Sequence, residues 1–235
     1  MPRPLHLAQS AELLQTILSG EAPADKQMER YFRAHPAMGV RDRAEVAETV
    51  YACLRHKRLL EHLAQSSDPA ALVAAHWLRE GVSARVLEQA GFGGDCRTLA
   101  ARVRTTDVAT LPFPVRASLP DWLADRLVAQ YGPEEADALA QALNRPAPVD
   151  LRVNTLKIKH DELAQRLTAA GFACDPTPYS PGGLRLRERA SVFRTALFRD
   201  GLFEVQDEGS QIVSFLLEPR RGETIVDFCA GAGGK

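Results

Sequence analysis

The sequence lacks the features that define several large classes of protein. Its four cysteines (Cys53, Cys96, Cys174 and Cys229) lie far apart and form no Cys-x-x-Cys pair, which argues against a disulfide framework. It has no apolar leader of signal-peptide type and no run of membrane-spanning length. We therefore expect a cytoplasmic protein with reduced thiols and no membrane partner.

The sequence also lacks an excess of charge of either sign. It has 29 Lys and Arg residues against 30 Asp and Glu, a formal net charge of −1. A uniformly basic surface is therefore absent, and any contact with RNA must come from local patches. The six histidines are scattered. Cys53 and His56 have the i, i+3 spacing of half a metal site, but no second pair completes it, so we predict no metal.

What remains is ordinary globular sequence, with 45% apolar and 25% charged residues over a length that suits two domains. From Leu5 to about Thr106 the apolar residues recur with helical spacing. The clearest helix is predicted to start at Asp42, because Glu45 follows three residues later as in a capping box. Short connections between such helices predict a compact all-α bundle over residues 1–110.

Prolines mark the next boundary. In Leu111-Pro-Phe-Pro114 each proline fixes its own φ and restricts its predecessor, which predicts an extended connector. Helices are expected over 120–131 and 133–143. The acids that open the second helix suit the helix dipole better than a catalytic cluster. Residues 111–148 are therefore interpreted as a linker with a helical pair.

A small α+β subdomain is predicted over residues 149–207. A strand is expected over 149–155, a helix over 161–170, and short strands over 184–187 and 202–205. Beyond it, residues 208–235 begin with an apolar helix that stops before Pro219, with Asp207 or Ser210 as its cap.

The end of this last segment is a short apolar run, Thr224 to Phe228, that breaks into glycines. The pattern predicts a buried parallel strand entering a tight loop. A phosphate-binding P-loop requires glycine where Cys229 stands. A dinucleotide loop places its acid about 20 residues later, whereas Asp227 precedes the glycines. An acid followed by small residues at alternate positions favours the nucleotide loop of S-adenosylmethionine (SAM) methyltransferases.

Three motifs resemble the RsmB/Sun (Nop2-like) family of SAM-dependent RNA cytosine-5 methyltransferases in wording, order and spacing. They are Asp150-Leu-Arg-Val-Asn-Thr-Leu-Lys157, Phe203-Glu-Val-Gln-Asp-Glu-Gly-Ser-Gln211 and Val226-Asp-Phe-Cys-Ala-Gly-Ala-Gly-Gly-Lys235. One departure is that Gly231-Ala232 replace the usual Ala-Pro, which makes the loop more flexible. A looser match over 39–58 resembles the helical NusB-like RNA-binding domain.

The resemblance implies a mixed fold: an all-α NusB-like bundle, an RRM-like α+β subdomain, and the first strand of an α/β Rossmann-like methyltransferase domain. SAM is the implied cofactor. Its expected binding residues are Cys229, Ala230, Gly231, Ala232, Gly233, Gly234 and Lys235. Lys235 is expected to pair with the SAM carboxylate, or else to be an exposed first-turn residue.

The family's chemistry is covalent: a cysteine thiolate adds to carbon 6 of cytosine, carbon 5 takes the methyl group, and a base removes its proton. The resemblance puts those catalytic residues beyond Lys235, so we expect none in this chain. Cys229 belongs to the cofactor loop and is not interpreted as the nucleophile.

Two groups of arginines are candidates for RNA contact. Arg185, Arg187 and Arg189 alternate, which places them on one face of a strand. Arg41 and Arg43 lie near the start of the helix in the NusB-like stretch. The alternative, purely structural interpretation is a charged strand edge for the first group and a solvent-exposed helix face for the second.

We therefore expect part of a methyltransferase that acts on RNA, most plausibly ribosomal, as a monomer. The 235 residues alone are expected to be inactive. One alternative is a non-catalytic RNA-binding protein with a vestigial loop. The other is a nucleotide-binding enzyme of the P-loop or dinucleotide type.

Overall fold

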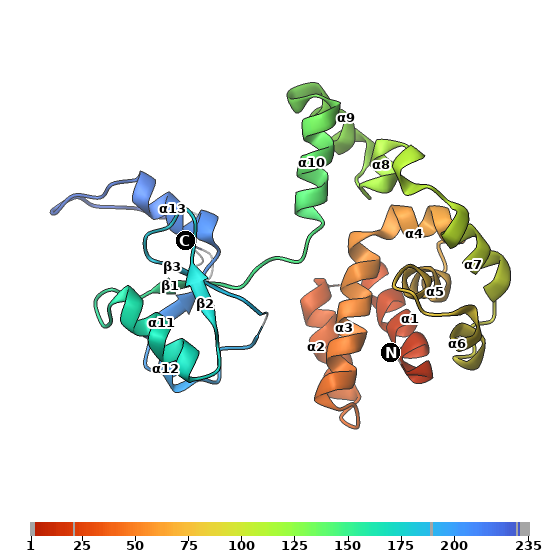
Figure 1. The fold of residues 1–235 in the computed structure, drawn as a ribbon, viewed down its shortest axis with the longest axis horizontal. Helices are drawn as coiled ribbons and strands as arrows, with labels where there is room; N and C mark the ends of the chain where they lie inside the picture. Colours follow the sequence, from red (N-terminus) through yellow and green to blue (C-terminus); the bar gives the residue numbers. More distant parts are fainter. Residues whose placement is uncertain (1–2, 21, 189, 229, 231–235) are drawn as a thin grey trace. The chain divides into compact units, whose positions relative to one another are not determined.

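The computed structural model describes residues 3–20, 22–188, 190–228 and 230. The chain separates into two compact units, Met1–Arg145 and Pro146–Lys235, which are described one at a time (Figure 1).

The first unit is helical throughout its described residues, as the periodicity predicts. Its elements are α1 (Pro4–Leu18), α2 (Ala24–Ala34), α3 (Val40–Arg55), α4 (Lys57–Ala64), α5 (Pro69–Arg79), α6 (Ala84–Gln89), α7 (Cys96–Thr105), the 3₁₀ turn η1 (Val108–Thr110), α8 (Phe113–Arg116), α9 (Asp121–Tyr131) and α10 (Pro133–Leu143).

Helix α5 is the centre of this bundle. It packs against α1, α3, α4 and α7, which surround it in Figure 1. Seven of its eleven residues are buried, from Pro69 to Trp77. A helix that is apolar on most sides must be enclosed, because each exposed large apolar side chain forfeits about 1.5–3 kcal/mol of burial. Asp68 caps the helix by accepting a hydrogen bond from the Ala71 amide.

The helix predicted to start at Asp42 is present, but its predicted start is wrong. Helix α3 begins at Val40, with Gly39 as its N-cap and no side-chain cap. Asp42 and Glu45 instead hold the buried ring of His6, at 3.2 and 3.3 Å from its two nitrogens. A tertiary contact between α1 and α3 therefore takes the side chains that a local capping box would use.

The second unit is a four-stranded antiparallel sheet with helices. Its elements are β1 (Asp150–Val153), α11 (His160–Ala169), β2 (Cys174–Pro176), β3 (Gly183–Leu186), α12 (Ala196–Arg199), β4 (Phe203–Val205) and α13 (Glu208–Leu216). The strand order is β2-β3-β1-β4. The predicted strands and helix are confirmed as β1, α11, β3 and β4. Strand β2 and helix α12 have only three and four residues, too few for any periodicity.

The register gives this sheet one apolar and one polar face. Leu151 pairs with Leu184 and Val153 with Phe203, and these four side chains are buried in the core of the unit. Asp150 pairs with Arg185, which in turn pairs with Asp175 of β2. Directly opposite residues of antiparallel strands share a face, so these charged side chains lie together on the other side.

The buried strand predicted over Thr224 to Phe228 is not formed. These residues have no strand assignment, and the Phe228 side chain is 96% exposed. A parallel strand needs neighbours on both edges and both faces, and the described residues supply none here.

Two partly buried histidines lie close together at the α3–α4 junction and on α5. Burial, reinforced by Arg79 and Arg55, lowers the pKa of His56 to about 4. Burial also lowers the pKa of His76, which outweighs the opposite effect of Glu80. Both rings are therefore neutral near pH 7.

This arrangement predicts that the helical unit loses stability in mild acid. Because the unfolded chain binds protons at about pH 6.5 while the folded rings resist them, the free energy of unfolding falls as the pH drops from about 7 towards about 4. Both tryptophans, Trp77 and Trp122, lie in this unit and report its urea unfolding by fluorescence.

Replacing both rings, His56→Gln with His76→Gln, should make the fall between about pH 7.5 and about pH 5 smaller. His62→Gln, at an exposed position of α4, is the matched control and should leave the fall unchanged. An equal fall in the double variant and the wild type would contradict the assignment.

Candidate functional site

Two of the predicted RNA-contacting arginines are held in ion pairs. The Arg185 guanidinium donates to both carboxylate oxygens of Asp150, at 2.7 and 2.8 Å. Arg187 makes the same paired contact with Asp175, at 2.9 and 2.7 Å. Paired, charge-assisted bonds of this kind are the geometry that a phosphate would otherwise receive. Arg189 lies outside the described residues.

The predicted arginines of the helical unit have different surroundings. Arg43 donates from Nε to the Met38 carbonyl, at 2.9 Å, and lies over the Phe32 ring, so it closes the turn before α3. Arg41 is exposed but lines a groove that also contains Glu45, Glu48 and Glu80. Those carboxylates oppose the approach of a phosphate chain.

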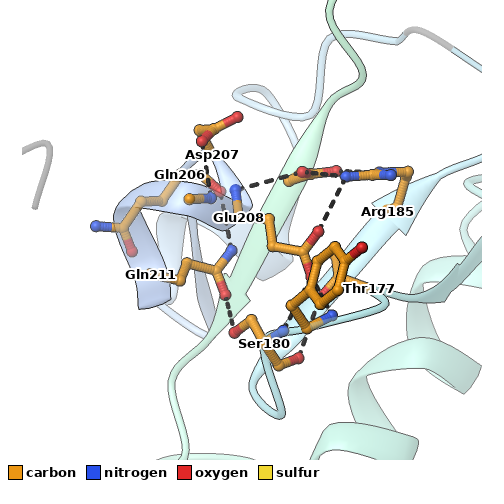
Figure 2. A network of polar contacts seen from close by, with 10 residues as sticks. Thr177, Ser180, Arg185, Gln206, Asp207, Glu208 and Gln211 are labelled. Atoms are coloured by element: carbon orange, nitrogen blue, oxygen red, sulfur yellow. Dashed lines mark hydrogen bonds and ion pairs between the residues drawn. The ribbon is translucent and has the colours of Figure 1, made fainter. Parts of the chain in front are cut away.

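The described part of the second unit contains a buried polar network centred on Glu208, the first residue of α13 (Figure 2). Glu208 is only 6% exposed. Its Oε1 accepts from the amides of Tyr179 and Ser180, at 2.6 and 2.9 Å. Its Oε2 lies 3.4 Å from Arg185, and its own amide donates to Asp150 at 3.3 Å. The carboxylate of Glu208 thus ties α13 to β3 and to the loop between β2 and β3, and its amide ties α13 to β1.

Neighbouring side chains extend this network along α13. The Ser180 hydroxyl donates to Gln211 Oε1 at 2.7 Å, and Gln211 Nε2 donates to the Gln206 carbonyl at 2.9 Å. Asp207 caps the helix by accepting from the Gly209 amide, which confirms one of the two predicted caps. Thr177 donates to the Ser180 carbonyl. Figure 2 shows these side chains converging on the start of α13.

The environment keeps the Glu208 carboxylate ionised. Burial alone raises its pKa, but the amides of Ser180 and Tyr179, the Thr177 hydroxyl and Arg185 outweigh burial and hold the pKa below its usual range. Arg185, which lies beside Glu208, is also held in its charged form, because hydrogen bonding to Asp150 raises the pKa of the Arg185 guanidinium. The charges are therefore fixed at neutral pH.

The network joins two motifs that are far apart in the sequence. Asp150 opens the motif that ends at Lys157, and Glu208 belongs to the motif that ends at Gln211. The first motif also forms hydrogen bonds to the loop before β4. Asn154 donates from Nδ2 to the Gly201 carbonyl at 2.8 Å, and Lys157 donates to the Asp200 carbonyl at 2.7 Å. The polar residues of these motifs are therefore structural partners of one another.

Sequence reasoning did not find this network, although a signal was present. Asp150 opens the first motif, and Glu208 lies within the second. Acids are seldom buried without a cation, and Arg185 lies between them in the sequence. The missing information was the register that places Arg185 opposite Asp150.

Most of the predicted cofactor loop lies beyond the part of the chain that the structure describes. Cys229, Gly231, Ala232, Gly233, Gly234 and Lys235 lie outside the described residues, and Ala230 is described as exposed. Just upstream, α13 and its end leave apolar side chains in solvent. These are Val213, Phe215, Leu216 and Leu217, all at least half exposed.

The described residues lack the features of a metal site and of a membrane span. They contain no group of three or more His, Cys, Asp or Glu side chains that could hold a metal ion. Within that same part of the chain, every helix is too short or too polar to cross a bilayer.

Comparisons with known proteins agree with the motifs. Residues 119–193 match the family model described as the RsmF/B-like methyltransferase, ferredoxin-like domain. The chain is 35% identical over 119 residues to a probable ribosomal RNA small subunit methyltransferase B of Synechocystis sp.. It is 39% identical over 119 residues to ribosomal RNA small subunit methyltransferase B of Xylella fastidiosa. These matches cover 50% and 51% of this chain and 27% of each relative.

Among solved structures, the crystal structure of PH0851 resembles the whole chain. The TM-score is 0.66 with 19% sequence identity, and the match covers 100% of this chain and 60% of the other. At that identity the likeness concerns the fold.

The matched domain defines the class: a ferredoxin-like domain of RsmF/B-like methyltransferases. These matches confirm the resemblance of the chain to the RsmB/Sun family.

The network predicts that neutralising Glu208 destabilises the second unit. In Glu208→Gln the amides of Tyr179 and Ser180 lose a charged acceptor, and Arg185 loses one of its two carboxylates. Since hydrogen bonds to charged groups contribute about 1.5–3 kcal/mol each, we expect the free energy of unfolding to fall by about 2 kcal/mol.

Glu204→Gln is the matched control, because Glu204 is exposed on β4 and makes the same change of charge. It should alter stability by less than about 0.5 kcal/mol. Circular dichroism of both variants during urea unfolding makes the comparison. Equal losses from the two variants would show that the network contributes little.

Proposed function

We propose that this chain is part of a SAM-dependent RNA (cytosine-5)-methyltransferase that acts on ribosomal RNA. The observation that carries the proposal is the match of residues 119–193 to the RsmF/B-like ferredoxin-like domain, whose β1 is tied to α13 by the Glu208 network. That helix leads directly to the glycine segment. The names of the relatives, ribosomal RNA small subunit methyltransferase B, support the choice of substrate.

In this proposal SAM is the cofactor and residues 229–235 hold it. Glycines at 231, 233 and 234 permit a close approach of the backbone, whose amides face the methionine end of SAM. Lys235 pairs with the SAM carboxylate. SAM supplies the methyl group, and the residues of this chain bind and orient it. The catalytic cysteines belong to another part of the protein.

The domain organisation follows from the same proposal. Residues 1–110 form a NusB-like RNA-binding bundle, 111–148 a linker and helical pair, 149–207 the α+β subdomain, and 208–235 the start of the methyltransferase domain. The exposed apolar side chains of α13 and of residues 225–228 support a covering sheet supplied by the rest of that domain. On this view the 235 residues alone are inactive, and the whole is a cytoplasmic monomer without metal.

The predicted RNA-contacting arginines differ in how readily they can meet a phosphate. The Arg187–Asp175 pair is exposed, with side-chain exposures of 62% and 55%. Exposed ion pairs contribute only about 0–1 kcal/mol, so a phosphate can displace Asp175. In contrast, the Asp150 partner of Arg185 is 1% exposed. We therefore propose Arg187, with Arg189 beside it in the sequence, as the stronger contacts.

The second candidate is a non-catalytic RNA-binding protein with a vestigial nucleotide loop. It is favoured by the replacement of Ala-Pro by Gly231-Ala232, which loosens the segment.

Bisulfite sequencing of small-subunit ribosomal RNA tests the enzyme directly. Deleting the gene should remove one methylated cytosine, and restoring the gene should bring the mark back. A full set of marks in the deletion strain would leave the RNA-binding alternative.

Calorimetry tests the loop in a protein that carries the whole methyltransferase domain. Gly233→Val places a branched side chain where the backbone must approach the cofactor, and should weaken SAM binding at least about tenfold. Gly182→Ala is the control, because a Cβ there has no atom within 4 Å. No heat of binding in the wild-type protein would favour the vestigial loop.

A further inference from the structure

The helical unit contains a cavity that the proposed function does not use. Its volume is about 570 Å³, and its walls come from the turn at His56, η1, α8 and α10. This volume falls within the range of small-molecule sites, about 300–1,000 Å³. The lining residues that matter below are His56, Ala109, Arg116, Asp137, Gln141 and Arg145.

Hydrogen bonds fix the polar wall of the cavity. Arg116 donates from Nε to Asp137 at 3.0 Å and from Nη1 to the Leu111 carbonyl at 3.1 Å. Gln141 Nε2 donates to the other oxygen of Asp137 at 2.7 Å. Asn144 Nδ2 donates to the Ala117 carbonyl at 3.0 Å. These contacts hold α8 against α10, so the wall is formed before any ligand arrives.

Some polar groups of the cavity wall are not used in these hydrogen bonds and remain available to bind a ligand. The side-chain amides of Gln141 and Asn144 each donate one N–H to the protein, and their oxygens have no hydrogen-bond partner among the described residues. Arg145 is exposed and forms no ion pair within the described part of the chain. The cavity therefore offers two acceptors on a fixed wall and one unmatched cation.

His56 adds a flat, uncharged ring to this set. Its Nδ1 is buried without a hydrogen-bond partner in the described structure. Burial lowers the pKa of His56 to about 4, so the ring is a neutral heteroaromatic surface near pH 7. Neutral aromatic rings stack on nucleobases of any sequence.

We propose that this cavity binds one nucleotide of single-stranded RNA, with its base against His56 and its phosphate on Arg145. The amide oxygens of Gln141 and Asn144 accept hydrogen bonds from amino or imino groups on the edge of the base. The inference rests on the proposed function in that RNA is the ligand. It goes further by assigning a nucleotide site to the helical unit, apart from the predicted arginines.

Fluorescence anisotropy with the full chain tests this site. The probes are fluorescein-labelled RNA hexanucleotides of adenosine, cytidine or uridine. Arg145→Gln should weaken binding about tenfold and lower the slope of log affinity against log salt by about 0.7, the value for one lost phosphate contact. Ala109→Glu, which adds a carboxylate at an exposed lining position, should also weaken binding about tenfold.

Arg126→Gln is the matched control. Arg126 is exposed on α9, in the same unit, and is not a lining residue of the cavity. It makes the same change of charge and should leave affinity and salt slope unchanged. Tryptophan fluorescence during urea unfolding verifies that all three variants are folded. Equal weakening by Arg126→Gln and Arg145→Gln, or no binding by the wild type, would overturn the proposal.

Photo-crosslinking gives an independent readout. A hexauridylate with one 4-thiouridine should crosslink to the peptides that contain His56 or residues 137–145, and Ala109→Glu should abolish those crosslinks. Crosslinks confined to other peptides would overturn the site. The outcome is separable from the proposed function, because the ribosomal cytosine mark and SAM calorimetry are measured without reference to this cavity.

Discussion

The second unit depends on a carboxylate that is buried at the start of a helix. Taking an ionised carboxylate out of water costs several kcal/mol, and only close, well-directed partners repay that cost. Glu208 has two backbone amides and a guanidinium, and its own amide is bound by Asp150. Three separate segments therefore have to be in place together before the charge is satisfied. This requirement fixes where α13 leaves the sheet.

The helical unit uses a similar arrangement at the contact between α1 and α3. His6 is buried between Asp42 and Glu45, and Arg3 also lies 3.1 Å from Asp42. At this contact, polar side chains that a local capping pattern assigns to a helix start are used for a tertiary contact instead. Non-directional apolar packing around α5 fills the bundle, whereas these directional contacts select one arrangement of its helices.

The sequence predicts the helices and strands of this protein better than it predicts the tertiary contacts between them. The bundle and the strands β1, β3 and β4 follow from periodicity and from prolines, because both signals are local. The position of α3 was mistaken by two residues, since Asp42 and Glu45 satisfy a capping pattern but bind His6. The polar network needed the pairing of Asp150 with Arg185, which no local pattern contains. The run at 224–228 has strand-like residues, but a strand exists only with neighbours to bond.

The ion pairs of the arginines show why the number of arginines in a segment is a poor predictor of an RNA-binding surface. Arg185 and Arg187 are two of the predicted RNA contacts, yet each faces a carboxylate across the sheet. Arg43 donates a hydrogen bond to a backbone carbonyl, and Arg41 lines a groove together with three glutamates. A cation attracts phosphate in proportion to the charge left over after its own partners, so the informative quantity is the unmatched cation rather than the cluster. Arg145 is one such cation, and it stands beside a preformed cavity.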